Sequence, residues 1–272
     1  MDQYRVFGNP IKQSRSPFIH QSFAQATKQV LNYEICHVEL DGFTEAVNDL
    51  IAVGGKGANV TAPFKDQALE IADVLSERAR LAGAVNTLSF KGGVIYGDNT
   101  DGEGLVQDLL RNQVKLANSR ILLLGAGGAA KGVILPLLAQ NPINIVIANR
   151  TVSKAEALID KFNDNRLKAC GFDLAEDEKF DVIINATSAS LTGALPPISP
   201  LLVHKSVVCY DMVYGKSLTP FLSWAQKNGA SKVVDGLGML VGQAAVSFSI
   251  WRKVQPEVES VLLDLRAAFL KE

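Results

Sequence analysis

The stretch Ile121-Leu122-Leu123-Leu124-Gly125-Ala126-Gly127-Gly128-Ala129-Ala130 decides the fold of this 272-residue chain. It opens with an apolar run typical of a buried strand. Gly125, Gly127 and Ala130 follow the spacing G-x-G-x-x-A, ahead of a helical pattern that ends near Gln140. The first glycine permits the tight turn, the second lets a diphosphate approach the backbone, and the small third residue lets helix and strand pack closely. An ordinary turn can have the same glycines, but this placement favours a dinucleotide site.

The strand predicted next, 144–148, ends in Asn149, Arg150 and Thr151, with Lys154 one turn later. A fold that binds NAD usually places a carboxylate there to accept from the ribose 2′-hydroxyl. Two cations stand there instead, and cations hold a 2′-phosphate that a carboxylate would repel. A solvated helix start is the structural alternative, disfavoured because cations oppose the dipole of a helix N-terminus. We therefore expect NADP(H), with its diphosphate at the start of the glycine-turn helix.

Strand and helix patterns alternate along the rest of the chain. We expect strands at 4–7, 33–38, 58–60, 84–90, 94–96, 120–124, 182–185 and 207–211. We expect helices at 17–28, 43–52, 66–80, 102–111, 153–162 and 220–228. This alternation favours mainly parallel sheets covered on both faces. Two final helical patterns, 240–253 and 256–271, have no strand between them and must bury their apolar stripes on an existing domain.

The prediction is an α/β protein of two domains. Residues 1–101 and 237–272 would form a mainly parallel, substrate-binding catalytic domain, to which the C-terminal helices return. Residues 102–236 would form a Rossmann-type NADP-binding domain.

Composition excludes several classes of function. A formal net charge of -1 gives no general attraction for nucleic acid or acidic membranes. The chain lacks a run of about 18 apolar residues and a basic, then apolar, start, so we expect a cytoplasmic protein. Its three cysteines, Cys36, Cys170 and Cys209, form no CxxC pair, and only Cys36 adjoins a histidine, His37, so we expect no metal.

Polar residues stand at several predicted strand ends of the first domain, where an open α/β sheet forms its ligand crevice. Ser14 and Ser16 precede a predicted helix; Ser16 could cap it, and both hydroxyls could also bind a carboxylate. Asn59 and Thr61 close a strand, and Lys65 follows among apolar neighbours.

Asn86 ends the next strand, and Asp101 opens the helix that joins the two domains. Asp101 could be no more than an N-cap, although a cap leaves some of its lone pairs for a substrate. This donor and acceptor set suits a substrate with one carboxylate and several hydroxyls. Beside a nicotinamide it suits hydride transfer at a carbinol carbon, with Lys65 handling the hydroxyl proton.

The chain resembles the shikimate dehydrogenase family over essentially its whole length. The segments that carry the resemblance are SRSP at 14–17, GANVTAPFK at 57–65, AGAVNT at 82–87, NTDGEG at 99–104, GAGGAA at 125–130, NRT at 149–151, DMVY at 211–214 and DGLGML at 235–240, followed by Gln243. The resemblance implies NADP-dependent interconversion of 3-dehydroshikimate and shikimate in the pathway to chorismate and the aromatic amino acids.

The resemblance also implies roles for individual residues. Lys65 would be the acid/base beside Asp101. The substrate would be bound by Ser14, Ser16, Asn59, Thr61, Asn86, Tyr214 and Gln243. NADP would be bound by Gly125, Ala126, Gly127, Gly128, Ala129, Ala130, Asn149, Arg150, Thr151, Lys154, Thr187, Met212, Gly236 and Glu77, although a solvated helix face explains Glu77 equally well. Shikimate and 3-dehydroshikimate would be the small-molecule partners of a monomer or homodimer.

Two positions depart from the family pattern: Ser190 stands where a glycine is usual, and Lys154 where an arginine is common. A lysine offers a point charge in place of a bidentate fork. Two alternative functions remain: a quinate/shikimate dehydrogenase with relaxed cofactor use, and a non-catalytic NADP-binding regulator. Retention of Lys65 and Asp101 disfavours the regulator, because a sensor of the cofactor alone needs neither.

Overall fold

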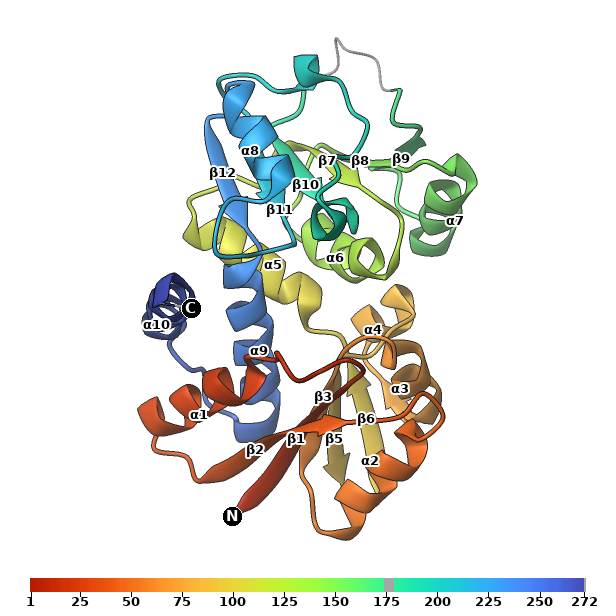
Figure 1. Cartoon of the computed structure of the whole chain (residues 1–272). Helices are drawn as coiled ribbons and strands as arrows, with labels where there is room; N and C mark the ends of the chain where they lie inside the picture. Colours follow the sequence, from red (N-terminus) through yellow and green to blue (C-terminus); the bar gives the residue numbers. More distant parts are fainter. Residues whose placement is uncertain (174–178, 272) are drawn as a thin grey trace. The chain divides into compact units, whose positions relative to one another are not determined.

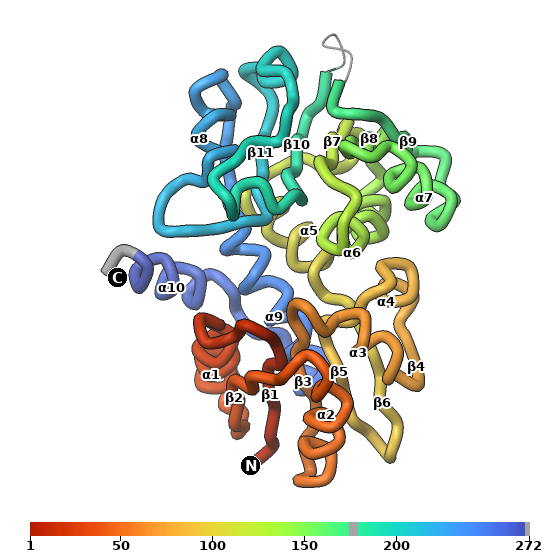
Figure 2. Tube along the Cα trace, turned by 45° about the vertical axis from the view of Figure 1, so that its right-hand side comes forward, coloured from red at the N-terminus to blue at the C-terminus, as the bar shows by residue number. Residues whose placement is uncertain are grey.

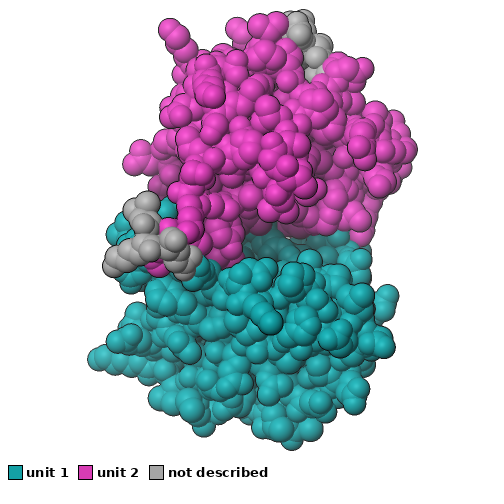
Figure 3. Space-filling view, in the orientation of Figure 1, with its two compact units in different colours: residues 1–104, 241–267 teal, residues 105–240, 268–272 magenta. Residues whose placement is uncertain are grey.

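A computed structural model of the chain describes residues 1–173 and 179–271 (Figure 1). It divides into two compact units, coloured separately in Figure 3. Unit 1 contains residues 1–104 and 241–267, and unit 2 contains residues 105–240 and those from 268 onward. The chain therefore passes from one unit to the other within helix α5 (Asp101–Arg111) and again within helix α9 (Leu237–Arg252).

These limits differ by a few residues from the predicted ones. Gly104 groups with unit 1, where a Cβ atom on Gly242 would lie 3.0 Å from its carbonyl oxygen. Gly238 groups with unit 2, where it lies against Asp108 of α5 and leaves no room for a side chain. The end of the last helix also groups with unit 2, and there the Phe269 ring lies 6.0 Å from that of Tyr214.

Unit 1 contains a mixed sheet of order β2-β1-β3-β5-β6-β4. The strands are β1 (Asp2–Gly8), β2 (Leu31–His37), β3 (Gly57–Val60), β4 (Val74–Leu75), β5 (Thr87–Lys91) and β6 (Val94–Asp98). β1 runs parallel to β2 and β3, and β4 to β6, whereas β5 is antiparallel to both of its neighbours. The helices are α1 (Ser16–Ala26), α2 (Phe43–Ala52), α3 (Lys65–Ile71), α4 (Glu77–Ala82) and α10 (Glu259–Lys271), with most of α9.

Alternating strand residues divide the core of unit 1 into two layers. Phe7, Val60 and Leu88 belong to the cluster that α2, α3 and α4 cover. Tyr4 and Val6 belong to the opposite cluster, against Trp251 of α9. Figures 1 and 2 show α1 and α9 on one side of this sheet and α2 to α4 on the other. The period of two in a strand accounts for this division.

The helix predicted over 66–80 is wrong, because two helices with a short strand between them occupy this range. α3 ends at Ile71, since Ala72 is extended, with ψ 124°. β4 then pairs with β6, and the Asp73 carboxylate accepts from the N–H of Ile95 at 2.7 Å. The Ser76 hydroxyl accepts from the N–H of Ala79 and so starts α4. Sheet pairing and a new N-cap therefore outweigh the continuous helical pattern.

Unit 2 contains a parallel sheet of order β12-β11-β10-β7-β8-β9, the order of a Rossmann fold. The strands are β7 (Arg120–Leu124), β8 (Asn144–Ala148), β9 (Leu167–Cys170), β10 (Val182–Asn185), β11 (Val208–Asp211) and β12 (Lys232–Asp235). The helices are α6 (Gly128–Leu138), α7 (Val152–Phe162) and α8 (Pro220–Lys227), with short 3-10 turns at Ala189–Thr192 and Pro200–Leu202. The strand order reverses between β7 and β10, which is where such sheets bind ligands.

The sequence patterns missed both edge strands of this sheet. Lys232 of β12 is exposed and the rest of that strand is half-buried, and in β9 Leu167 alone is buried. A strand covered on one side and open at the edge lacks the continuous apolar run that revealed β7 and β8. Within the described part of the chain, no helix has both the length and the apolar character needed to cross a bilayer.

His20 of α1 is fully buried in the layer beneath α9. Its ring stacks on that of Tyr33, with centroids 4.2 Å apart, and its Nε2 lies 3.1 Å from the Oδ1 of Asn59. Burial, offset in part by the hydrogen bond to Asn59, lowers the pKa of His20 from 6.5 to about 3. The imidazole is therefore neutral in the folded protein at physiological pH.

This buried imidazole makes stability depend on pH. The pKa of His20 is lower in the folded state than in the unfolded state, so the unfolded state binds more protons between about pH 3 and 6.5. Stability therefore falls as the pH falls through that window. We expect the wild type to lose about 2 kcal/mol relative to a His20→Phe variant between pH 7 and pH 5. Urea titrations at the two pH values measure the difference, and an unchanged difference contradicts this assignment.

Candidate active site

A lysine and an aspartate of unit 1 form the centre of the candidate site. Lys65 is the first residue of α3, directly after Phe64, which is fully buried against the Phe43 ring at 5.1 Å. Asp101 is the first residue of α5. Lys65 Nζ donates to Asp101 Oδ2 at 2.5 Å, and the two side chains are 30% and 17% exposed. A charged pair that is half-buried yet open to solvent can exchange a proton with a ligand.

Asn86 holds the other oxygen of the same carboxylate. Its Nδ2 lies 2.8 Å from Asp101 Oδ1, and also donates to Thr100 Oγ1 at 2.9 Å and Gln243 Oε1 at 3.3 Å. The N–H of Asp101 donates to Asn99 Oδ1 at 3.2 Å. Asn99 therefore satisfies the backbone at the start of α5, while Lys65 and Asn86 each donate to one oxygen of the Asp101 carboxylate.

An ion pair next to this segment fixes the end of β6. Arg78 donates to both carboxylate oxygens of Asp98, at 2.7 and 2.9 Å, and Ser76 donates to one of them at 2.6 Å. Burial acts to raise the pKa of Asp98, but the hydrogen bonds from Arg78 and Ser76 together lower it below its ordinary value. α4 is thus anchored to the strand that leads into the Asn99–Asp101 turn.

The two serines lie at the start of α1, as the sequence predicted, but Ser16 is not its cap. The helix begins at Ser16, Arg15 occupies the N-cap position, and the Ser14 hydroxyl accepts from the N–H of Ser16 at 3.3 Å. Accepting does not use the hydroxyl hydrogen of Ser14, which can still donate to an anion at this helix N-terminus.

Three further residues of unit 1 were predicted to bind the substrate, and the structure gives each of them different hydrogen bonds. Thr61 follows β3, where its N–H donates to the carbonyl of Phe7 at 2.9 Å. Gln243 lies on α9 and receives the hydrogen bond from Asn86. Asn59 is 6% exposed, and its amide bonds on both sides to groups of the protein. Its predicted contact with the substrate stays a prediction.

The glycine turn of unit 2 has the geometry that a diphosphate requires. Gly125 has φ +106°, a conformation that favours glycine, and a Cβ there would lie 3.2 Å from the Thr187 methyl group. Beside Gly127, the N-cap of α6, and beside Gly128 there is open space. Ala130 is fully buried against the sheet. Open backbone at a helix N-terminus fits a diphosphate.

A pocket of about 580 Å³ extends from this turn to the end of β8. It is lined by Ala126, Gly127, Lys131, Asn149, Arg150, Thr151, Lys154, Ala157, Leu158 and Lys161. The first turn of α7 has no acidic residue. Lys131 and Lys161 were not among the predicted residues, although Lys161 lies two turns after Lys154 and hence on the same helix face. Four cations around one pocket fit a phosphate.

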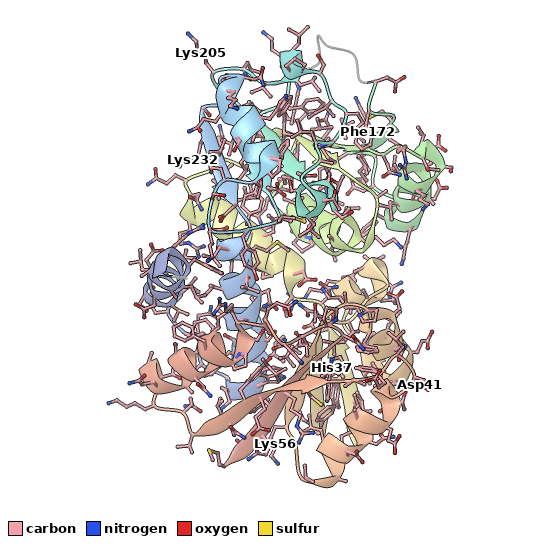
Figure 4. All side chains as sticks on the ribbon, viewed as in Figure 1. His37, Asp41, Lys56, Phe172, Lys205 and Lys232 are labelled. Atoms are coloured by element: carbon pink, nitrogen blue, oxygen red, sulfur yellow. The ribbon has the colours of Figure 1, made fainter. Side chains whose placement is uncertain are left out.

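A second pocket of about 580 Å³ shares the glycine turn, Asn149 and Arg150 and continues to the 186–189 loop. Its apolar lining includes Phe172, labelled in Figure 4, and Leu195, Pro196 and Pro197. Thr187 lies in this lining, and its hydroxyl donates to Asn185 Oδ1 at 2.7 Å. The pocket can take the apolar ring of a nucleotide beside its phosphates.

Ser190, the departure from the family pattern, has a structural role in this loop. It is 9% exposed, and its hydroxyl donates to Asp211 Oδ2 at 2.6 Å. Thr219 donates to the same oxygen at 2.6 Å. The loop that lines the second pocket is thereby fastened to the end of β11.

The remaining predicted residues are distributed over both units. Met212 and Tyr214 follow β11 in unit 2. Gly236 precedes α9 and lies against the backbone of Met212, where a side chain would collide. Glu77 is exposed at the start of α4, in unit 1, and its predicted contact with the cofactor stays a prediction.

Models of protein families match three parts of the chain. The shikimate dehydrogenase substrate binding domain matches residues 6–88, and the shikimate / quinate 5-dehydrogenase model matches residues 107–193. The shikimate 5'-dehydrogenase C-terminal domain matches residues 236–262. Together the matches extend across both units.

Comparison with individual proteins gives the same family. The shikimate dehydrogenase (NADP(+)) of Colwellia psychrerythraea is 66% identical over 267 residues, 98% of this chain and 97% of its own length. The shikimate 5-dehydrogenase of Thermus thermophilus, solved with NADP(H) and shikimate, is 29% identical with a TM-score of 0.88, covering 98% of this chain and 100% of that one. Ligand-free 5-ketofructose reductase of Gluconobacter sp. is 30% identical with a TM-score of 0.87, covering 98% and 99%. This chain belongs to the shikimate dehydrogenase family.

Proposed function

We propose that this protein is an NADP-dependent oxidoreductase that reversibly reduces 3-dehydroshikimate to shikimate, a step toward chorismate and the aromatic amino acids. The observation that carries the proposal is the hydrogen bond from Lys65 to Asp101, at the start of two helices and beside a cluster of amides and hydroxyls. The 66% identity to a shikimate dehydrogenase (NADP(+)) supports the substrate and the cofactor. A cytoplasmic location and a monomeric or dimeric state stay predictions.

In the proposed mechanism the protein's residues transfer the proton and orient the substrate. NADPH supplies a hydride to the carbonyl carbon when it is bound. Lys65 Nζ donates its proton to the carbonyl oxygen, and the neutral amine that remains regains a proton from water. Asp101 accepts the hydrogen bond from Lys65 Nζ and holds it in place. The reverse reaction takes the hydroxyl proton back to Lys65.

The serines and the amides would bind and orient the substrate. Ser14 and Ser16 would donate to the carboxylate at the N-terminus of α1, assisted by Tyr214. Thr61, Asn86 and Gln243 would bind the ring hydroxyls. The proposal therefore requires a substrate with a carboxylate on one side and hydroxyls on the other.

The cofactor side rests on the glycine turn and the cations of unit 2. Residues 126–130 would bind the diphosphate, and Asn149, Arg150, Thr151 and Lys154 the 2′-phosphate. Thr187, Met212 and Gly236 would lie beside the nicotinamide half of the cofactor.

The similar fold of 5-ketofructose reductase means that the fold by itself does not fix the substrate. A turnover assay that follows NADPH absorbance with shikimate, quinate and 5-ketofructose, each with NADP and NAD, tests the proposal. We expect shikimate with NADP to give the highest kcat/KM. A preference for another substrate contradicts the assignment, and no turnover with any pair favours a non-catalytic NADP-binding protein.

Replacing Lys65 should remove the acid/base group. We expect Lys65→Met to lower kcat by about 10²- to 10⁴-fold, because general acid catalysis contributes that much. The affinity for NADPH, measured by fluorescence titration, should stay near that of the wild type. Lys56→Met is the matched control: Lys56 is exposed at the other end of β3 and is labelled in Figure 4. A Lys65→Met variant as active as this control removes Lys65 from the mechanism.

Replacing Arg150 should weaken binding of the 2′-phosphate and leave the rest of the cofactor's binding unchanged. We expect Arg150→Ala to raise the KM for NADPH about tenfold or more, since a charge-assisted hydrogen bond is lost, and to leave the KM for NADH nearly unchanged. Lys205→Ala, at an exposed lysine of the same unit outside the pocket lining, is the control (Figure 4). Equal increases in the two KM values would show that Arg150 does not read the 2′-phosphate.

A further inference from the structure

Three buried hydroxyls in unit 1 have no role in the proposed mechanism. They belong to Thr87 of β5, Thr100 before α5 and Ser247 of α9, whose exposed fractions are 1%, 0% and 0%. The oxygens of Thr87 and Ser247 lie 2.8 Å apart, and Thr100 lies 3.2 Å from Ser247 and 3.4 Å from Thr87. We call these three groups the hydroxyl cluster. Fully buried polar groups cost stability unless each is hydrogen-bonded, so the arrangement of their partners is informative.

The hydroxyl of Thr87 and the backbone N–H of Thr100 hold the Asn86 amide in one orientation. Thr87 donates to Asn86 Oδ1 at 2.8 Å, and the backbone N–H of Thr100 donates to the same oxygen at 2.9 Å. Since an N–H can only donate, this atom of Asn86 must be the carbonyl oxygen. The NH₂ group of Asn86 then faces Asp101 Oδ1, at 2.8 Å. A flipped amide would instead turn its oxygen toward a carboxylate.

Asn59 donates hydrogen bonds to the hydroxyl cluster. The orientation of its own amide is also determined. Its Nδ2 donates to the backbone carbonyl of Asn86 at 3.2 Å, which can only accept. The same NH₂ group also lies 3.0 Å from Ser247 Oγ and 3.2 Å from Thr87 Oγ1. On the other side, Asn59 Oδ1 must accept, so Tyr33 donates to it at 2.7 Å.

The same reasoning determines the tautomer of His20. Because Asn59 Oδ1 accepts, the nitrogen 3.1 Å away, His20 Nε2, must carry the hydrogen. His20 Nδ1 is then an unprotonated lone pair, and this atom has no hydrogen-bond partner in the structure. The neutral imidazole and Tyr33 therefore donate to Asn59, which donates to Thr87 and Ser247 of the hydroxyl cluster. Each of these contacts with Asn59 has one possible direction.

We propose that the hydroxyls of Thr87 and Ser247 are positioning residues for the Lys65–Asp101 pair. Together with the backbone N–H of Thr100, they hold the Asn86 amide where its NH₂ group donates to Asp101 Oδ1, and so keep Asp101 Oδ2 directed at Lys65. Ser247 lies on α9, four residues after Gln243. Its single hydroxyl hydrogen can go either to Thr87 Oγ1 at 2.8 Å or to the carbonyl of Gln243 at 3.0 Å. The inference rests on the proposed function, since it assigns these groups to the acid/base step.

Two variants of Thr87 separate positioning from packing. Thr87→Val keeps the shape and removes the hydroxyl, whereas Thr87→Ser keeps the hydroxyl and removes the methyl group. We expect Thr87→Val to lower kcat about tenfold, less than the ~100-fold that a 1 Å misplacement can cause, with the KM for NADP within about twofold of wild type. Thr87→Ser should retain most of the wild-type kcat. The opposite order, an active valine and an impaired serine variant, assigns Thr87 to packing and overturns the proposal.

Two serines of α9 give a second test that does not depend on Thr87. Ser247→Ala should lower kcat in the same sense, and Ser249→Ala should not. Ser249 lies on the same helix and makes the same kind of hydrogen bond, to the carbonyl of Ala245 at 2.9 Å, but its other partners are Val254 and Gln255. Equal effects of the two alanine variants on kcat would overturn the proposal.

A measurement without turnover distinguishes failure of this inference from failure of the proposed function. In protein labelled at asparagine side chains, the NH₂ signal of Asn86 reports its hydrogen bond to Asp101. We expect this NMR signal to shift in Thr87→Val and Ser247→Ala and to stay in place in Ser249→Ala. An unmoved signal in both variants overturns the positioning role, whatever the substrate proves to be. Absence of shikimate turnover in the wild type would overturn the function alone.

Discussion

The hydrogen bond between Lys65 Nζ and Asp101 Oδ2 is the interaction on which the proposed chemistry depends. It joins the start of α3 to the start of α5, two segments 36 residues apart in the chain. The ends of β3 and β6 bring these helix starts together. Arg78 and Asp98 tie α4 to the end of β6, the strand that leads to Asp101.

The layered core of unit 1 explains how an apolar sheet can carry a polar site. Alternation along β3 puts Ala58 and Val60 in the cluster beneath α2 and α3, and turns Asn59 toward α1 and α9. Alternation along β5 does the same for Leu88 and Thr87. One face of the sheet is therefore ordinary core, and the other holds hydrogen-bonded amides and hydroxyls. The polar face is stable because its members satisfy one another.

Much of this could be predicted from the sequence. The stretch from Ile121 to Ala130 formed the expected strand, turn and helix, with Gly125 in a conformation that favours glycine and Ala130 packed against the sheet. Lys65 and Asp101 could be named as site residues because they follow β3 and β6. Asn86, expected to end a strand, instead directly precedes β5. The resemblance to the family supplied the substrate, which spacing alone does not contain.

The features that the sequence did not predict were missed for physical reasons. The 66–80 pattern is helical throughout, and its interruption by β4 depends on pairing with β6, a contact between segments distant in sequence. β9 and β12 lie at sheet edges, where burial leaves a weak pattern. Thr87 and Thr100 lie in the family segments AGAVNT and NTDGEG, but the sequence predicted no role for either residue. Only the fold brings them to Ser247. A buried hydroxyl looks the same in sequence as an exposed one.

The most direct measurement of the central claim is a double-mutant cycle between Lys65→Met and Asp101→Asn, with kcat for shikimate oxidation as the readout. If the two side chains act as one acid/base unit, each single variant loses most of the activity. The second substitution then costs almost nothing in the background of the first. Losses that multiply in the double variant would mean that Lys65 and Asp101 act independently, and would contradict the account.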